Sequence, residues 1–118
     1  MTHFKVIRTP AFDTLAAEYA EDHPGIEDDL AWLTGRLAQA PESIGDRVQE
    51  LGKLALPIFK TRCKDSCCKI GASGAWRIYY AIKKNTKEVY LLFLHHKKEL
   101  ENPGAKFLLQ KLERAFGT

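Results

Sequence analysis

The residues best suited to chemistry lie between positions 57 and 99, where cations recur at regular positions in apolar, strand-like segments. Lys60 and Arg62 are two residues apart in one segment, and Arg77 and Tyr79 have the same spacing in the next. Side chains at i and i+2 share one face of a strand, so each pair must point in one direction. Cations displayed in this way predict a sheet surface that binds a polyanion, such as a chain of phosphates.

The third apolar segment ends in His95, His96, Lys97 and Lys98. An unperturbed imidazole titrates at about pH 6.5, so either histidine is a candidate for proton transfer. Because neighbouring residues in a strand point to opposite faces, only one of the two can readily join the face of Arg77. The sequence leaves open which one it is.

The charge of the chain is divided unevenly along its length. Residues 1–50 contain 4 Lys and Arg against 10 Asp and Glu, a net charge of −6, whereas residues 51–118 contain 14 against 5, a net charge of +9. The overall charge of +3 therefore hides a basic part that attracts phosphates and an acidic part that does not. A solvated basic surface without a partner is the simpler alternative.

Three cysteines, Cys63, Cys67 and Cys68, form a cluster with Lys64 and Lys69 beside them. Their odd number does not suit a disulfide framework, and their spacing lacks the paired Cys-x2-Cys pattern of a zinc site. Nearby lysines could lower the pKa of a thiol and make it prone to oxidation. We favour the interpretation that these are small loop residues without a catalytic or metal-binding role.

The length of 118 residues is that of a single domain, which we place at residues 1–118. The first residues contain no apolar run of signal-peptide length, and no segment approaches the roughly 20 apolar residues of a membrane span. We therefore expect a soluble, cytoplasmic protein.

The pattern of apolar residues predicts one strand, two helices, an irregular connection, three strands and a final helix. The second helix is the clearest, because Ile26, Leu30, Leu33 and Leu37 fall on one face. Acidic residues in its first turn suit the helix dipole, which gives them a structural explanation. The predicted elements are strand 4–8, helix 11–21, a second helix from Ile26 to Ala40, strands 54–63, 75–83 and 88–96, and a helix opened by Pro103.

The strands differ in how their two faces are composed. Trp76, Ile78, Tyr80 and Ile82 share one face of their strand, which we expect to be the core side, and Arg77 lies on the other. The last strand is apolar on both faces, which predicts a central position in the sheet. Together the elements indicate a small α+β fold, with an N-terminal strand and a helical hairpin followed by an antiparallel sheet and a C-terminal helix.

This order of elements, together with several short motifs, resembles the RelE/ParE superfamily of type II toxins, and the RelE-like and HigB-like members are the most similar. The resemblance covers nearly the whole chain. Its motifs are Gly45-Asp46-Arg47, Lys60-x-Arg62, Gly71-x-x-Gly74-x-x-Arg77 and an apolar strand that ends in Lys97-x-Glu99.

The resemblance implies a RelE-like fold, a cognate antitoxin and cleavage of mRNA on the ribosome by a reaction that needs no metal and no cofactor. Other members inhibit DNA gyrase and cut nothing, so a non-enzymatic or decayed toxin is the alternative. By resemblance, Lys60, Arg62 and Arg77 would hold the scissile and flanking phosphates. His95 and His96 would transfer protons, although a structural role at the end of the sheet is an equal alternative for His95.

The resemblance also implies contacts to RNA from Tyr79, Lys97 and Lys98, with Tyr79 either stacking on a base or packing in the core. One feature departs from the family. Several active members carry a catalytic Tyr or His near the C-terminus, and in this chain neither residue type follows His96. Proton transfer would then fall to His95, His96 or a lysine.

Overall fold

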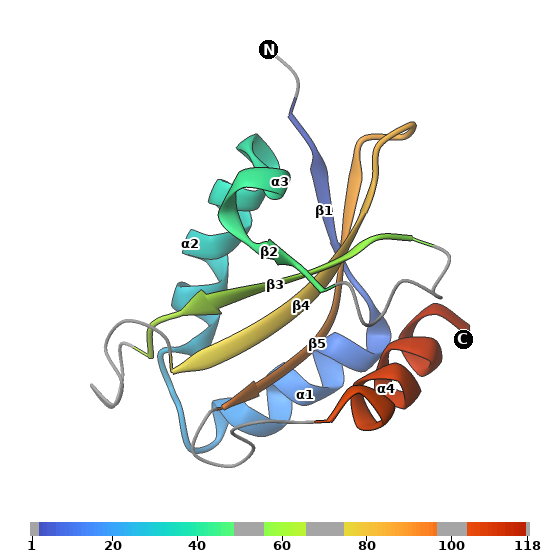
Figure 1. Cartoon of the computed structure of the whole chain (residues 1–118). Coiled ribbons are helices and arrows are strands. Elements are labelled where there is room, and N and C mark those ends of the chain that lie inside the picture. Colours follow the sequence, from blue (N-terminus) through green and yellow to red (C-terminus); the bar gives the residue numbers. More distant parts are fainter. Residues whose placement is uncertain (1–2, 49–55, 66–74, 97–103, 118) are drawn as a thin grey trace.

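The computed structural model describes residues 3–48, 56–65, 75–96 and 104–117, and its elements form a mixed α+β fold around one sheet (Figure 1). The predicted order of elements is confirmed, except that the connection expected to be irregular contains a short helix and a short strand. In chain order they are β1 (Lys5–Arg8), α1 (Pro10–Ala20), α2 (Ile26–Gln39), α3 (Pro41–Ile44), β2 (Asp46–Arg47), β3 (Ile58–Cys63), β4 (Trp76–Lys83), β5 (Glu88–His96) and α4 (Ala105–Gly117).

The five strands lie in the order β1-β5-β4-β3-β2. β1 is parallel to β5, and the other neighbouring pairs are antiparallel. The central position predicted for the last strand is confirmed, since β5 lies between β1 and β4. Helices pack on both sides of the sheet, which explains why both faces of β5 are buried and apolar.

Helices α1 and α2 cover one face of the sheet. Thr9 caps α1 by accepting a hydrogen bond from the backbone N–H of Phe12, and Pro10 occupies the first turn, where no amide partner is needed. The four apolar residues predicted for one face of α2, Ile26, Leu30, Leu33 and Leu37, are all buried. They pack against the predicted core face of β4, which includes Trp76, Ile78, Tyr80 and Ile82.

Helix α4 covers the opposite face. Its residues Leu108, Leu112 and Ala115 pack against Tyr79 and Phe93 of the sheet. Phe107 of the same helix is instead one of the exposed large apolar residues. Figure 1 shows α4 and α2 on different sides of the sheet, so the two faces have different surroundings.

The connection after α2 is more ordered than its glycines suggest. It contains the short helix α3 and the two-residue strand β2, which extends the sheet beyond β3. Gly45 permits this pairing, because a Cβ atom there would lie 2.7 Å from the carbonyl oxygen of Lys60 and 2.5 Å from the hydroxyl of Tyr80. That hydroxyl donates a 2.6 Å hydrogen bond to the carbonyl of Pro41, which ties α3 to β4.

Two sequence predictions fall partly outside the described residues. The strand expected from Leu54 is described from Ile58 onward, and only its last part is therefore confirmed. The glycine-containing loop at 64–74 is described only up to Asp65. None of the described helices combines the length and the apolar character that a bilayer crossing requires.

Candidate nucleic-acid interface

The predicted cations form a row across three strands. Arg62 of β3 lies directly opposite Arg77 of β4, and Arg77 lies directly opposite His95 of β5. Side chains of directly opposed residues leave the sheet on the same face, so all three belong to one surface. The sequence left open which histidine shares the face of Arg77, and the structure shows that it is His95.

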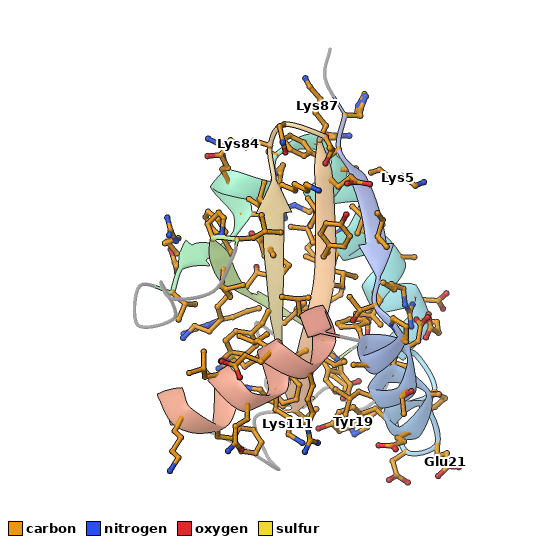
Figure 2. The ribbon with its side chains drawn as sticks, turned by 90° about the vertical axis from the view of Figure 1, so that its right-hand side faces the viewer. Lys5, Tyr19, Glu21, Lys84, Lys87 and Lys111 are labelled. Carbon is orange, nitrogen blue, oxygen red and sulfur yellow. The ribbon has the colours of Figure 1, made fainter. Side chains whose placement is uncertain are left out.

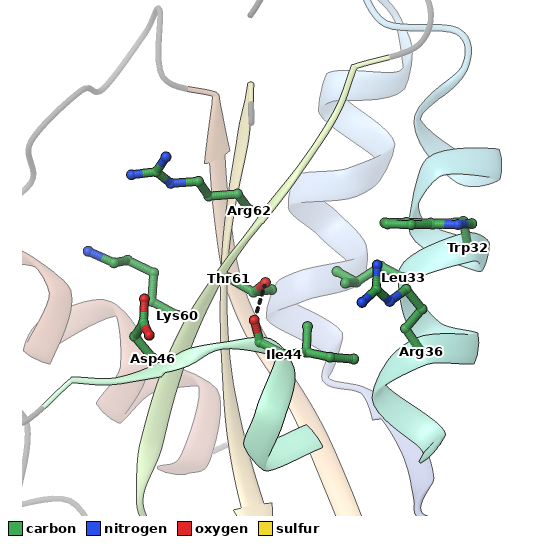
Figure 3. A pocket seen from close by; sticks show the side chains of 8 residues that line it. All are labelled: Trp32, Leu33, Arg36, Ile44, Asp46, Lys60, Thr61 and Arg62. Carbon is green, nitrogen blue, oxygen red and sulfur yellow. Dashed lines mark hydrogen bonds between the residues drawn. The ribbon is translucent and has the colours of Figure 1, made fainter. Parts of the chain in front are cut away.

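A second row runs parallel to the first and belongs to the same face. Lys60 lies opposite Tyr79, and Tyr79 lies opposite Phe93. Figure 3 shows the side chains of Lys60 and Arg62 pointing the same way from β3, as their spacing predicted. We call the surface formed by Lys60, Arg62, Arg77, Tyr79 and His95 the cation face.

Accessibility changes steeply across the cation face. Lys60 and Arg62 are exposed and Arg77 is half-buried, whereas Tyr79 and His95 are only 3% and 2% exposed. The rings of Tyr79 and His95 stack with their centroids 5.9 Å apart, and Phe93 packs against both. The cations near the β3 edge can therefore meet a ligand, while the two buried rings form the floor beneath them.

His96 lies on the other face of the sheet, away from the remaining predicted site residues. Its ring is 1% exposed and packs edge-on against Trp76, with centroids 4.9 Å apart. The alternation of side chains along β5 is the cause, because His95 occupies the cation face. His96 is therefore not placed to act on a ligand bound by Arg62 and Arg77. Lys97 and Lys98 lie outside the described residues.

Helix α4 brings two residues to the cation face that the sequence analysis did not assign to it. Phe107 is 37% exposed, and its ring meets that of Phe93 at a centroid distance of 6.1 Å. The ammonium group of Lys111 lies 5.4 Å from the centre of the Phe107 ring, a cation–π arrangement. The signal was present in the sequence as an aromatic and a lysine four residues apart, but the packing of α4 over β5 was needed to place them.

Two hollows border the cation face or the helix α4 beside it. One, of about 240 Å³, lies over Leu92 and Phe93 between α1 and α4 and is rimmed by Lys111 and Arg114. Its apolar floor and cationic rim suit a flat aromatic group attached to a phosphate.

The other hollow, of about 370 Å³, borders β3 at Lys60 and Arg62 and reaches Trp32 and Arg36 of α2 (Figure 3). The guanidinium of Arg36 lies 5.0 Å from the centre of the Trp32 ring. Asp46 lines the same hollow and is the register partner of Lys60, so one carboxylate faces the exposed lysine. This acidic residue lowers the positive potential at one end of the cation face.

The basic residues at the opposite end of the sheet are separate from the cation face. Figure 2 shows Lys5, Lys84 and Lys87 around the β4–β5 hairpin, far along the strands from Lys111. Lys84 forms a 3.0 Å ion pair with Glu42. Among the described residues, basic side chains thus lie at both ends of the sheet.

Cys63 differs from the loop residue that we expected. It is the last residue of β3 and is buried, and its thiol contacts the backbone carbonyl of Asp29 at 3.5 Å. Burial, followed by the nearby negative charge of Asp29, raises its thiol pKa to about 11, although Lys64 acts in the opposite direction. Lysine neighbours therefore do not activate this thiol. Cys67 and Cys68 lie outside the described residues.

No protein-family model matches the chain, and comparison with curated proteins finds no significant similarity.

Proposed function

We propose that this protein is a toxin of the RelE/ParE superfamily, with a RelE-like fold, that cleaves mRNA at the ribosome and is restrained by a cognate antitoxin. The observation that carries the proposal is the row formed by Arg62, Arg77 and His95, with Lys60 beside it on the same face. The short motifs of the sequence support the same assignment. Of the motif residues that the structure describes, Asp46 and Arg47 form β2, Lys60 and Arg62 lie on β3, and Arg77 lies on β4.

The proposed reaction is attack of a ribose 2′-hydroxyl on the neighbouring phosphate, with departure of the 5′-oxygen. The pentacoordinate state carries more negative charge than the ground state, so fixed cations that meet it lower the barrier. Arg62 and Arg77 present two planar guanidinium groups from adjacent strands, and each can bind two phosphate oxygens at once. No metal is required for this chemistry.

Proton transfer falls to Lys60 in this proposal. His95 is 2% exposed beneath the arginine row, so its ring supports Arg77 and does not meet a substrate in this conformation. Lys60 is exposed on the same face, where a lysine ammonium can pass a proton to the leaving 5′-oxygen while water takes the proton of the attacking 2′-hydroxyl. The buried position of Tyr79 likewise makes it part of the floor, and Phe107 on α4 is an accessible aromatic on which a base can stack.

One observation favours a second candidate function, a toxin that binds a protein target such as DNA gyrase and has no nuclease activity. The described part of the cation face exposes no imidazole, since His95 is buried and His96 lies on the opposite face. A protein that only binds needs the cations and not a proton donor. Both functions therefore need Arg62 for binding, whereas only the nuclease needs Lys60 for proton transfer.

The experiment that separates them incubates the purified protein with programmed ribosomes and maps mRNA ends by primer extension. We expect codon-positioned breaks that are lost in Arg62→Ala and Lys60→Ala and retained in Lys84→Ala, which removes the same charge at the hairpin end. Arg62 and Lys60 are exposed, so these changes do not disturb the core. Intact mRNA together with gyrase-dependent DNA breaks would overturn the nuclease assignment.

A further inference from the structure

A second group of chemically capable side chains lies on the opposite face of the sheet. His23 comes from the connection between α1 and α2, Asp65 follows β3, and His96 ends β5. Nδ1 of His23 lies 2.6 Å from Oδ2 of Asp65, and Nε2 of His96 lies 3.3 Å from the same oxygen. Each of the three residues offers one potential ligand atom, and these three atoms all lie within 4.8 Å of one another.

The carboxylate at the centre of this group is almost completely buried. Asp65 is 1% exposed, and removing an ionised carboxylate from water is costly unless a cation and hydrogen bonds compensate. Within the described residues, its second oxygen, Oδ1, has no hydrogen-bond partner. Among the described residues, this buried oxygen is thus an acceptor available to a metal ion.

Aromatic rings enclose the group and hold the two histidines in place. The rings of His23 and His96 stack with centroids 4.8 Å apart, and Trp76 packs edge-on against both. Tyr19 packs against Trp76, and its hydroxyl accepts a 3.3 Å hydrogen bond from the backbone N–H of His96. The indole Nε1 of Trp76 is buried and, among the described residues, has no hydrogen-bond partner.

We propose that His23, Asp65 and His96 bind one divalent transition-metal ion, with Zn²⁺ as the best fit. Two imidazole nitrogens and one carboxylate oxygen match the ligands that zinc takes, whereas magnesium and calcium prefer oxygen ligands alone. Zinc bonds of about 2.0–2.1 Å place two tetrahedral ligands roughly 3.3 Å apart. The 2.6 Å contact between His23 and Asp65 is thus the metal-free arrangement, and the two atoms would move apart by less than 1 Å to admit the ion.

The proposed ion would fasten three segments that are distant in sequence. His96 pairs with Trp76 in the register of β4 and β5, next to the pair formed by Arg77 and His95. The proposed metal site therefore lies on the opposite side of the sheet from the cation face. A bound ion would stabilise the ends of the strands that carry Arg77 and His95. Its role is structural, and its binding can be measured whether or not the protein cleaves RNA.

The test uses the full chain with Cys67 and Cys68 replaced by serine, because free thiols bind zinc in any conformation. After treatment with a chelator, Zn²⁺ is titrated by calorimetry and the melting temperature is followed. We expect one equivalent to bind and the melting temperature to rise with zinc concentration. With Co²⁺, visible absorption should appear without the near-ultraviolet band of a cobalt–thiolate bond.

The variants His23→Gln and Asp65→Asn should each weaken zinc binding by at least about 100-fold, since loss of a direct ligand costs more than loss of its supporting contact. His3→Gln, which alters an exposed histidine, is the matched control and should leave binding unchanged. His23 is the least buried of the three ligands, so its variant keeps the test valid where Asp65→Asn fails to fold. Absence of binding, or equal binding by His23→Gln, would overturn the site.

Discussion

Arg62 and Arg77 are register partners across β3 and β4, so two guanidinium groups leave the same face of the sheet from adjacent strands. Like charges placed directly opposite one another are unfavourable in a sheet. An anion bound between them would remove that penalty and gain charge-assisted hydrogen bonds. We therefore place the pair at the centre of the proposed phosphate site.

The first prediction concerns the salt dependence of RNA binding. Arg62→Ala should weaken the affinity for single-stranded RNA and reduce the slope of log K against log salt by about 0.7, the value for one lost phosphate contact. Fluorescence anisotropy at several salt concentrations measures both. Lys84→Ala removes an equal charge at the hairpin, where Lys84 pairs with Glu42, and should change neither quantity by a comparable amount. Equal slopes for the two variants would contradict the phosphate site.

The second prediction concerns base stacking on α4. Phe107 is the exposed aromatic of the proposed interface, with Lys111 close to its ring. Phe107→Leu should weaken binding of a short RNA by roughly 1–3 kcal/mol, because leucine keeps the apolar volume and lacks a π face. Phe107→Tyr keeps the ring and should bind like the parent protein. Equal losses in both variants would show that the position acts through packing.

The sequence predicted the parts of this site that depend on local periodicity. Alternation along β3 and β4 correctly placed Lys60 with Arg62 and separated Arg77 from Trp76. It also showed that the side chains of His95 and His96 must point to opposite faces of the sheet. It could not say which one joins Arg77, since that depends on the register between β4 and β5, which shifts at Tyr79 and Tyr80.

The remaining parts depend on contacts between distant residues, which periodicity does not report. Phe107 belongs to the site only because α4 crosses β5, and β2 forms only because Gly45 lets it approach β3. The cluster of His23, Asp65 and His96 draws on three separate segments with no common motif. Burial was the second unknown, because a tyrosine or histidine on the correct face can still lie beneath its neighbours.

The third prediction compares two glycines. A Cβ atom at Gly45 would meet the Lys60 carbonyl and the Tyr80 hydroxyl, so Gly45→Ala must push β2 away from the sheet and should cost about 1–3 kcal/mol of unfolding free energy. Gly35 lies within α2 with open space around it, so Gly35→Ala should stabilise by about 0.5–1 kcal/mol. Urea denaturation of both variants checks the opposite signs. A neutral Gly45→Ala would show that β2 does not need the close approach.

The fourth prediction concerns the Cys63 thiol. Its pKa of about 11 lies about two units above that of an ordinary thiol, so at pH 8 it holds roughly a hundredfold less thiolate. Iodoacetamide should therefore modify Cys63 at least about a hundredfold more slowly in the folded protein than in urea. Peptide mass spectrometry over time gives the rate for this residue separately. A similar rate in both states would contradict the burial that we describe.

The last prediction is a pH dependence of stability. Arg8, at the end of β1, pairs with Glu27 in the first turn of α2 at 2.7 Å, and this contact lowers the pKa of the Glu27 carboxyl. A carboxyl whose pKa is lower in the folded state stabilises the protein above its unfolded value of about 4.3, and the contribution is lost as the pH falls through the folded pKa.

The side chain of Glu27 is mostly exposed, so solvent screening limits the contribution to about 0.5 kcal/mol at pH 7 and low salt. The difference in unfolding free energy between the parent protein and Glu27→Gln should therefore be near that value at pH 7. It should decline below about pH 4.3 and shrink in 1 M salt. A difference that stays constant from pH 7 to pH 2 would mean that the amide disturbs packing, and that the ion pair with Arg8 does not hold β1 against α2.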